Sequence, residues 1–310
     1  MNSHFDSSIA LALVFCLCLP SNKTFAQLAV SDGPPAGSQN SIVPNSAFFI
    51  GAGAGYGNTT VTGQSLWGFG NSNIYQNGIP LQVGSAAGTG YYSMPSSSTF
   101  VPSVQLGYFK HFENSNWLWG GKFSYNYLGA TSSVQPALVP QAGAYTPGTT
   151  GGGPTTPFTG NFVINSYQIT ITNQFLLAPI IGWSFDKGFI YTGAGPSLSN
   201  VTTSINGSVG TANLGGNPWQ NVTGAPQSFS SSSWVFGGAI MAGGTYFLSP
   251  TWFLDFSYTF GITGNNYVSS VSTYVNPNAG NGVSGYGSTI LNSNGYVITN
   301  AVMLTINKKF

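Results

Sequence analysis

Side chains that could carry acid–base chemistry are scarce in this chain. Only 4% of the residues are Asp, Glu, Lys or Arg, and arginine is absent. Nucleic-acid binding through a basic patch is therefore not expected. Beyond residue 45 the ionisable candidates are Lys110, His111, Glu113, Lys122, Asp186, Lys187, Asp255, Lys308 and Lys309.

His111 and Glu113 are the one pair whose types and spacing could support catalysis. They share a strand face, and an enzyme that transfers acyl groups needs a histidine beside a nucleophile and a carboxylate. A hydrogen-bonded histidine near a turn is the simpler interpretation. No His, Cys or carboxylate cluster has metal-site spacing, and the glycines after Gly51 do not fit G-x-G-x-x-G. The sequence predicts no catalytic residue, no cofactor and no metal.

The closing stretch, Gly295 to Phe310, indicates that β-strands are the elements that position the ionisable residues. Its alternate residues separate an apolar set from a mixed set, as in a strand with two different faces. The apolar set is Val302, Leu304, Ile306, Lys308 and Phe310, and the mixed set is Ala301, Met303, Thr305, Asn307 and Lys309.

The composition indicates which solvent the apolar face meets. An ordinary soluble domain is roughly one quarter charged, whereas this chain is 42% hydrophobic, 15% aromatic and nearly uncharged. That hydrophobic content also argues against disorder. No apolar run reaches the roughly 18 residues of a spanning helix. Apolar residues at every second position instead predict strands that face lipid.

Residues 1–26 have the layout of a secretory signal peptide. An apolar run from Ile9 to Pro20 precedes small residues at a cut between Ala26 and Gln27. Residues 27–45 are expected to form a non-periodic periplasmic lead-in. Both cysteines lie in the signal peptide, so the mature chain would have no disulfide.

Turn signals divide residues 46–310 into four similar units. Short polar turns are expected at 113–116, 186–188 and 249–251, and long Gly-, Ser-, Thr- and Asn-rich loops at about 63–99, 132–160, 206–231 and 269–293. Each unit is a strand, a long loop and a returning strand. The pattern predicts an all-β chain of eight antiparallel strands in an up-and-down barrel.

Parity assigns the faces of the strands. Large side chains are expected to face lipid, because the lumen of an eight-stranded barrel has room only for side chains. Lys122 and Asp255 then face inward at similar heights, and we expect them to pair, directly or through water and Gln105 or Asn126. Two solvated residues near an open mouth are the alternative. Gln105, His111 and Asn126 are the predicted luminal polar residues.

The fourth and fifth strands fit this scheme less cleanly. Leu176 and Ile180 fall on the luminal face, and Pro179 and Pro196 interrupt the strands. The sequence predicts either bulges there or an error of one residue in register.

This layout resembles the small eight-stranded outer-membrane β-barrels, namely the OmpA transmembrane domain, OmpX and the opacity-type surface proteins. The resemblance implies a membrane-spanning barrel in the bacterial outer membrane, with three short periplasmic turns and four long extracellular loops. Phe310 then resembles the C-terminal signal that the outer-membrane assembly machinery recognises.

The function expected from these features is non-enzymatic. The barrel would be a platform for four uncharged extracellular loops, with a structural or surface-interaction role. Its partners would be outer-membrane lipid, the assembly machinery and an unidentified loop ligand. The alternatives are a narrow porin-like channel for small solutes and a secreted soluble β-protein.

Overall fold

The computed structural model describes residues 42–148, 154–213, 219–277 and 283–310. Its described part is built from strands, and contains no helix that is long and apolar enough to cross a membrane. The strands are β1 (Ser46–Gln76), β2 (Ile79–Tyr92), β3 (Ser97–His111), β4 (Trp117–Val134), β5 (Ala137–Pro147), β6 (Thr156–Phe185), β7 (Gly188–Asn213), β8 (Gln220–Asn221), β9 (Gln227–Phe247), β10 (Trp252–Thr263), β11 (Val268–Asn276) and β12 (Val283–Lys309).

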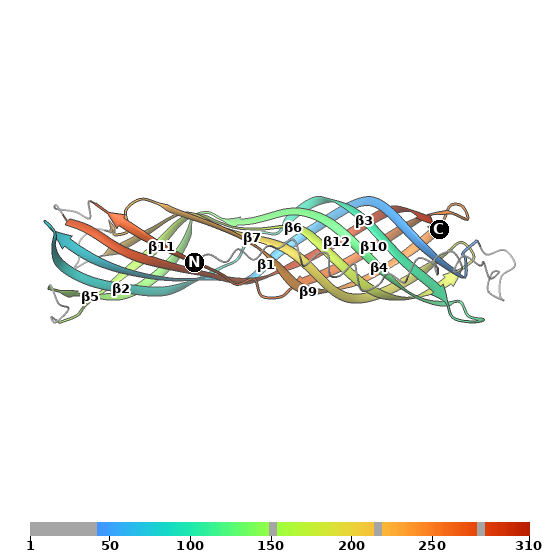
Figure 1. Cartoon of the computed structure of the whole chain (residues 1–310), viewed down its shortest axis with the longest axis horizontal. Coiled ribbons are helices and arrows are strands. Elements are labelled where there is room, and N and C mark those ends of the chain that lie inside the picture. Colours follow the sequence, from blue (N-terminus) through green and yellow to red (C-terminus); the bar gives the residue numbers. More distant parts are fainter. Residues whose placement is uncertain (1–41, 149–153, 214–218, 278–282) are drawn as a thin grey trace, which may run out of the picture.

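Eight of these strands close into an antiparallel ring. The order is β1-β3-β4-β6-β7-β9-β10-β12, and β12 pairs back onto β1. The closing register runs from Phe49 opposite Lys309 to Gln76 opposite Val283. Figure 1 shows the result as a long, narrow cylinder. The predicted eight-stranded antiparallel barrel is confirmed.

Three tight turns join the ring at one end, which we call the short-turn end. Phe112 N donates to Trp117 O at 2.9 Å, Phe247 N to Lys187 O at 2.8 Å, and Leu248 N to Trp252 O at 2.9 Å. These bonds lie at the three places where the sequence predicts short turns.

At the opposite end the four long connections are largely strand. β1 continues past the ring and turns at Asn77 and Gly78, whose positive φ values of 51° and 80° suit a two-residue hairpin turn. β2 then runs back along it. We call this part the hairpin section. It includes β2, β5, β8 and β11 and the extensions of β1, β4, β6, β7, β9 and β12.

The wall of the hairpin section is a second circuit of strands in the order β11-β12-β1-β2-β5-β6-β7-β9. Among the described residues no backbone register joins β9 to β11. A side chain connects them instead, because Gln227 Nε2 of β9 donates to Thr273 O of β11 at 2.9 Å, and Ser233 Oγ of β9 donates to Asn266 Oδ1, just before β11, at 3.1 Å.

The outer surface of the ring near the short-turn end is apolar, and we call this part the belt section. On β1 it extends from Phe48 to Tyr56, which is the length that a tilted spanning strand needs. Other exposed members include Val104, Leu106, Trp117, Trp119, Leu177, Ile181, Trp183, Ile190, Ile240, Trp252, Phe256, Val302, Leu304 and Ile306.

Beyond the belt, hydroxyls and amides that bond across strands lie on the outer surface among exposed apolar side chains such as Val83 and Val271. Asn58 donates to Ser98 at 3.0 Å, Thr202 to Ser232 at 3.1 Å, and Ser204 and Ser230 share a bond of 2.9 Å. The chemical character of the outward face therefore changes along single strands.

The interior is filled in layers. An aromatic layer at the short-turn end, the rim plug, contains Phe49, Phe109, Phe189, Phe247 and Phe253. Further in, an apolar cluster that we call the middle plug includes Leu66, Val101, Leu128, Phe162, Tyr167 and Ile169. Large side chains thus occupy the lumen as well as the lipid side, and the rule that they all face outward is incomplete.

β6 and β7 are the fourth and fifth strands of the ring, for which the sequence predicts either bulges or an error in register. Leu176 and Ile180 are buried, 1% and 5% exposed, on the luminal face. The register shifts between Ile171 and Gln174, so the bulge lies there. Pro179 and Pro196 interrupt the ladder between β6 and β7 without changing the register on either side.

The predicted signal peptide, its cut between Ala26 and Gln27, and most of the predicted lead-in lie outside the described residues. The lead-in's last residues enter the barrel mouth rather than stand apart from it. Ile42 N donates to Asp186 O at 3.1 Å, and Val43 is 2% exposed against the rim plug.

Candidate functional site

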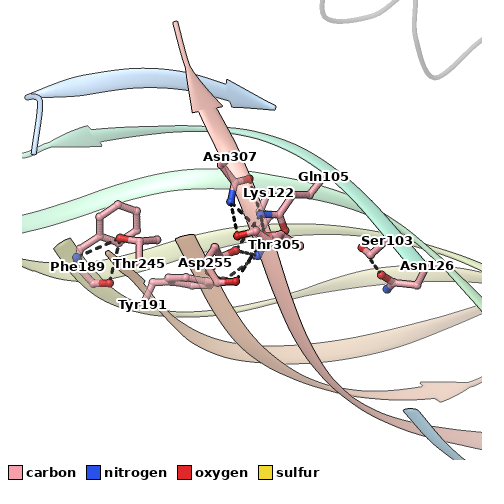
Figure 2. A network of polar contacts seen from close by, with 10 residues as sticks. All are labelled: Ser103, Gln105, Lys122, Asn126, Phe189, Tyr191, Thr245, Asp255, Thr305 and Asn307. Carbon is pink, nitrogen blue, oxygen red and sulfur yellow. Dashed lines mark hydrogen bonds and ion pairs between the residues drawn. The ribbon is translucent and has the colours of Figure 1, made fainter. Parts of the chain in front are cut away.

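The structure brings Lys122 of β4 and Asp255 of β10 together inside the ring. Lys122 Nζ and Asp255 Oδ2 form an ion pair, and each residue is 2% exposed. Parity places them inside because Trp119 and Phe123 on β4, and Phe256 on β10, face the opposite way. Figure 2 shows the pair at the centre of a polar network.

Tyr191 of β7 is bonded to both members of the pair. Lys122 Nζ donates to the Tyr191 hydroxyl at 2.8 Å, and this hydroxyl donates to Asp255 Oδ1 at 2.8 Å. The ammonium also lies 5.2 Å from the centre of the tyrosine ring. Each oxygen of the Asp255 carboxylate therefore has a partner, which is the condition for tolerating a buried charge.

Gln105 of β3 links the pair to β12. Its Nε2 lies 2.9 Å from Asp255 Oδ2 and 2.7 Å from both Thr305 Oγ1 and Asn307 Oδ1. An amide nitrogen has only two hydrogens, so it satisfies two of these three oxygens at a time. The network (Gln105, Lys122, Tyr191, Asp255, Thr305 and Asn307) thus ties five strands across the lumen.

The other predicted luminal residues lie outside this network. Asn126 accepts a 2.7 Å bond from Ser103 one layer further in. His111 ends β3 at the rim, where its Nδ1 lies 3.1 Å from Asn45 O. His111 Nε2 has no hydrogen-bond partner among the described residues, and Glu113 is exposed in the turn. The structure does not build a catalytic pair from them.

Sequence reasoning missed Tyr191, Thr305 and Asn307. Thr305 and Asn307 share the luminal parity of Met303 on the closing strand, so the signal was present. Tyr191 shares the parity of the luminal Gly193 on β7, a strand whose prolines obscured the alternation. Proximity between these strands could not be read from the sequence, because it depends on the tilt of the ring.

The network has no geometry for chemistry. Lys122 is committed to Asp255 and Tyr191, and the described residues contain no group of three or more His, Cys, Asp or Glu that could hold a metal. The rim plug covers the network on one side and the middle plug on the other. The network acts as a cross-brace, because its contacts join strands across the lumen.

The outside of the belt section and the charged pair inside it together identify the fold. A closed ring has no free sheet edges, its outside is apolar over the length of a membrane core, and its charged pair is inside. Trp117, Trp183 and Trp252, all exposed, lie next to the short turns, as in an aromatic girdle. The chain has the fold of a small outer-membrane β-barrel.

No protein-family model and no curated protein sequence matches the chain. Solved outer-membrane proteins match over most of their length with low identity and low superposition scores. The assignment of the fold therefore rests on the strand order and the belt of this chain.

Three of the solved structures illustrate that similarity. Neisserial surface protein A is 11% identical, with 80% of this chain and 96% of that chain covered and a TM-score of 0.29. OprG from Pseudomonas aeruginosa is 10% identical, with 85% and 96% covered and a TM-score of 0.30. The outer membrane protease OmpT from Escherichia coli is 10% identical, with 85% and 97% covered and a TM-score of 0.29.

A second candidate site of this barrel is a cavity of about 90 Å³ inside the hairpin section. It lies beyond the middle plug, and Phe162 of β6 belongs to both. The walls come from β1, β2, β5, β6, β7 and β11, and from Val222 and Thr223 just after β8. At its margin burial raises the pKa of the Tyr274 hydroxyl. This hydroxyl therefore stays protonated and donates to Asn71 O at 2.8 Å.

Proposed function

We propose that the protein is a non-enzymatic protein of the bacterial outer membrane whose barrel displays the hairpin section outside the cell. The observation that carries this proposal is the division of the ring into an apolar belt and a charge-free extension. The four segments 63–99, 132–160, 206–231 and 269–293 contain no Asp, Glu, Lys, Arg or His. Such a surface suits contact with a neutral partner better than electrostatic capture.

The absence of acid–base groups from the hairpin section supports the non-enzymatic part of the proposal. A hydrolytic site at that end would need a carboxylate or a histidine. The charged residues of the ring lie at the short-turn end or inside the lumen, where the plugs separate them from the hairpin section.

The packed interior supports a platform over the alternative, a narrow channel for small solutes. A conducting pore needs a continuous polar path, whereas here two apolar plugs enclose the ion pair. The rim plug alone places four phenylalanine rings together, with Phe109 and Phe189 centroids 4.9 Å apart and Phe247 and Phe253 centroids 5.0 Å apart.

The partners follow from this placement. Outer-membrane lipid covers the belt section, and the assembly machinery would recognise Phe310 before insertion. In the folded barrel Phe310 N donates to Phe48 O at 2.9 Å, while its side chain remains 69% exposed at the rim. The ligand of the hairpin section is uncharged on this reasoning.

One experiment on intact cells tests the display role. The two natural cysteines lie within the predicted signal peptide, so single cysteines can be placed at Ile79, 64% exposed at a hairpin tip, and at Glu113 in a short turn. We expect a membrane-impermeant maleimide to label Ile79→Cys in intact cells and Glu113→Cys only after lysis. The reverse pattern would refute the proposed orientation.

Planar-bilayer recording separates the platform from the channel. The purified protein, shown to be folded by its heat-dependent gel mobility, is expected to give no stepwise current and no swelling of liposomes in small sugars. Reproducible single-channel steps from the folded form would favour the channel instead.

A further inference from the structure

The cavity in the hairpin section is too well formed to be a gap between loops. Its lining comes from six strands whose registers fix their positions, and from Val222 and Thr223, which follow β8. It lies next to a layer of the interior that is fully packed, since Leu66 and Ile164 of the middle plug are both 0% exposed. The void therefore begins at the ring of Phe162, where the packed layer of the middle plug ends.

Three glycines leave room for the Phe162 ring at this boundary. A Cβ at Gly68 would come within 2.7 Å of the Phe162 ring, and Cβ atoms at Gly70 and Gly210 would come within 3.3 Å. The ring fits because these neighbours on β1 and β7 have no side chain. Phe162 is 4% exposed, so its small free area is the floor of the cavity.

Several polar groups of the wall are bonded within the wall, whereas Ser72 Oγ, which also lines the cavity, has no hydrogen-bond partner among the described residues. Tyr274 OH donates to Asn71 O, Gly210 N donates to Thr223 Oγ1 at 2.7 Å, and Thr211 Oγ1 donates to Asn161 O at 3.2 Å. In its hydrogen-bonded orientation the Gln141 amide bridges Ala86 O and Gly68 O, both at 3.3 Å. Water in a cavity needs two to four polar partners. These contacts leave a mainly apolar surface facing the void.

The chemistry of a suitable occupant follows from this wall. Every lining residue is uncharged, so a charged ligand would lose its hydration without gaining a counter-charge. Phe158, Phe162 and Tyr145 present aromatic surface, and the Tyr145 and Phe158 centroids are 6.3 Å apart. An apolar cavity of about 150 Å³ in another protein holds benzene or xenon. A partly open space of about 90 Å³ suits a molecule, or the end of a molecule, of that size or smaller.

We propose that the hairpin section binds a small, uncharged, predominantly apolar molecule in this cavity, against the rings of Phe162, Phe158 and Tyr145. Binding depends on shape and on apolar contact rather than on hydrogen bonds or charge. The inference goes beyond the display role, because it requires neither a protein partner nor a conducting lumen.

β2 offers a matched pair of variants for the test. Ala86 lines the cavity, whereas its neighbour Ala87 pairs with Phe69 on the outer face of the same strand. The substitution Ala86→Leu fills the void, and Ala87→Leu adds the same atoms outside it. Neither residue belongs to the belt section, so insertion into the membrane is unaffected.

The measurement is the amide nuclear magnetic resonance spectrum of the protein in lipid nanodiscs, titrated with benzene and, separately, with benzoate. We expect benzene to shift the amide signals of Gly84, Gly160 and Gly210 in the wild type and in Ala87→Leu. In Ala86→Leu the apparent affinity should fall by about tenfold or more, equivalent to about 1.4 kcal/mol. Benzoate has the same ring with a charge and should give no such shifts.

Two results would overturn the proposal. One is a benzene response confined to amides of the belt section, which would indicate partitioning into lipid. The other is an equal response in Ala86→Leu and Ala87→Leu. If Ala86→Leu does not fold, the comparison of benzene with benzoate on the wild type decides alone, since equal shifts by both would contradict an uncharged apolar site. Failure of the labelling experiment would leave this result unchanged.

Discussion

The belt section and the hairpin section share long strands but differ in the side chains that they carry inside and outside. In the belt section the outside is apolar and a charged pair lies inside. In the hairpin section bonded hydroxyls and amides lie on the outside together with exposed apolar side chains such as Ile79 and Val271, and the inside holds Phe162 and a mainly apolar cavity. β9 passes from one to the other between Trp234 and Ser232. The outward face of a single strand can therefore change from apolar to polar along its length.

The sharpest test of this contrast removes one charge from the belt interior. In Asp255→Ala the Lys122 ammonium stays buried without a counter-charge, and we expect a loss of about 3 to 5 kcal/mol of unfolding free energy. Urea titration in detergent micelles, followed by the gel mobility of folded and unfolded forms, measures it.

The double variant Lys122→Met with Asp255→Leu is the control for that loss. It removes both charges and fills similar volume, so most of the stability should return. A double variant as unstable as Asp255→Ala would mean that the network contributes through hydrogen bonds to Gln105 and Tyr191 rather than through the ion pair.

A second test places the same charge on the outside of each section. Ile240→Arg on β9 faces lipid in the belt section and should cost about 2 to 4 kcal/mol. Ser230→Arg lies on the same face of the same strand within the hairpin section, and should change stability by no more than about 0.5 kcal/mol. Unfolding in nanodiscs measures both, and equal costs would place Ser230 in the membrane.

A smaller effect is expected from crowding inside the belt section. A Cβ at Gly53 would lie 2.1 Å from Leu304 O, so Gly53→Ala must push β1 away from β12. We expect a cost of about 1 to 3 kcal/mol. Gly121→Ala has nothing within 4 Å and is the matched control. The thermal unfolding midpoint should be lower for Gly53→Ala than for Gly121→Ala. Similar midpoints would show that β1 can move away from β12 at little cost.

Much of the belt section was predictable because few residues carry charge and the solvent on one side is lipid. Alternation from Val302 to Phe310 set the lipid face, and the parity of Lys122 and Asp255 then placed both inside. Phe109 and Phe253 were harder to place, because near the rim large apolar residues occur on both faces. No alternation distinguishes the two sides there.

The strands of the hairpin section were not predictable in the same way. Segments such as 206–231 are rich in Gly, Ser and Asn, which have low strand propensity and favour turns. They form strands because each pairs with a neighbour already fixed by the ring, as Ser230 does with Ser204 of β7. The cavity forms through these tertiary contacts, so no local sequence pattern predicts it.

The junction of β1 with β12 has a consequence for how the chain reaches this state. The longest ladder of the barrel joins the beginning of the described chain to its end, from Phe49 with Lys309 to Gln76 with Val283. Contacts of such high sequence separation slow folding. Until the last strand arrives, β1 and β10 remain unpaired edges that could recruit other chains. The nascent barrel must therefore be protected from aggregation until the pairing of β12 with β1 closes the ring.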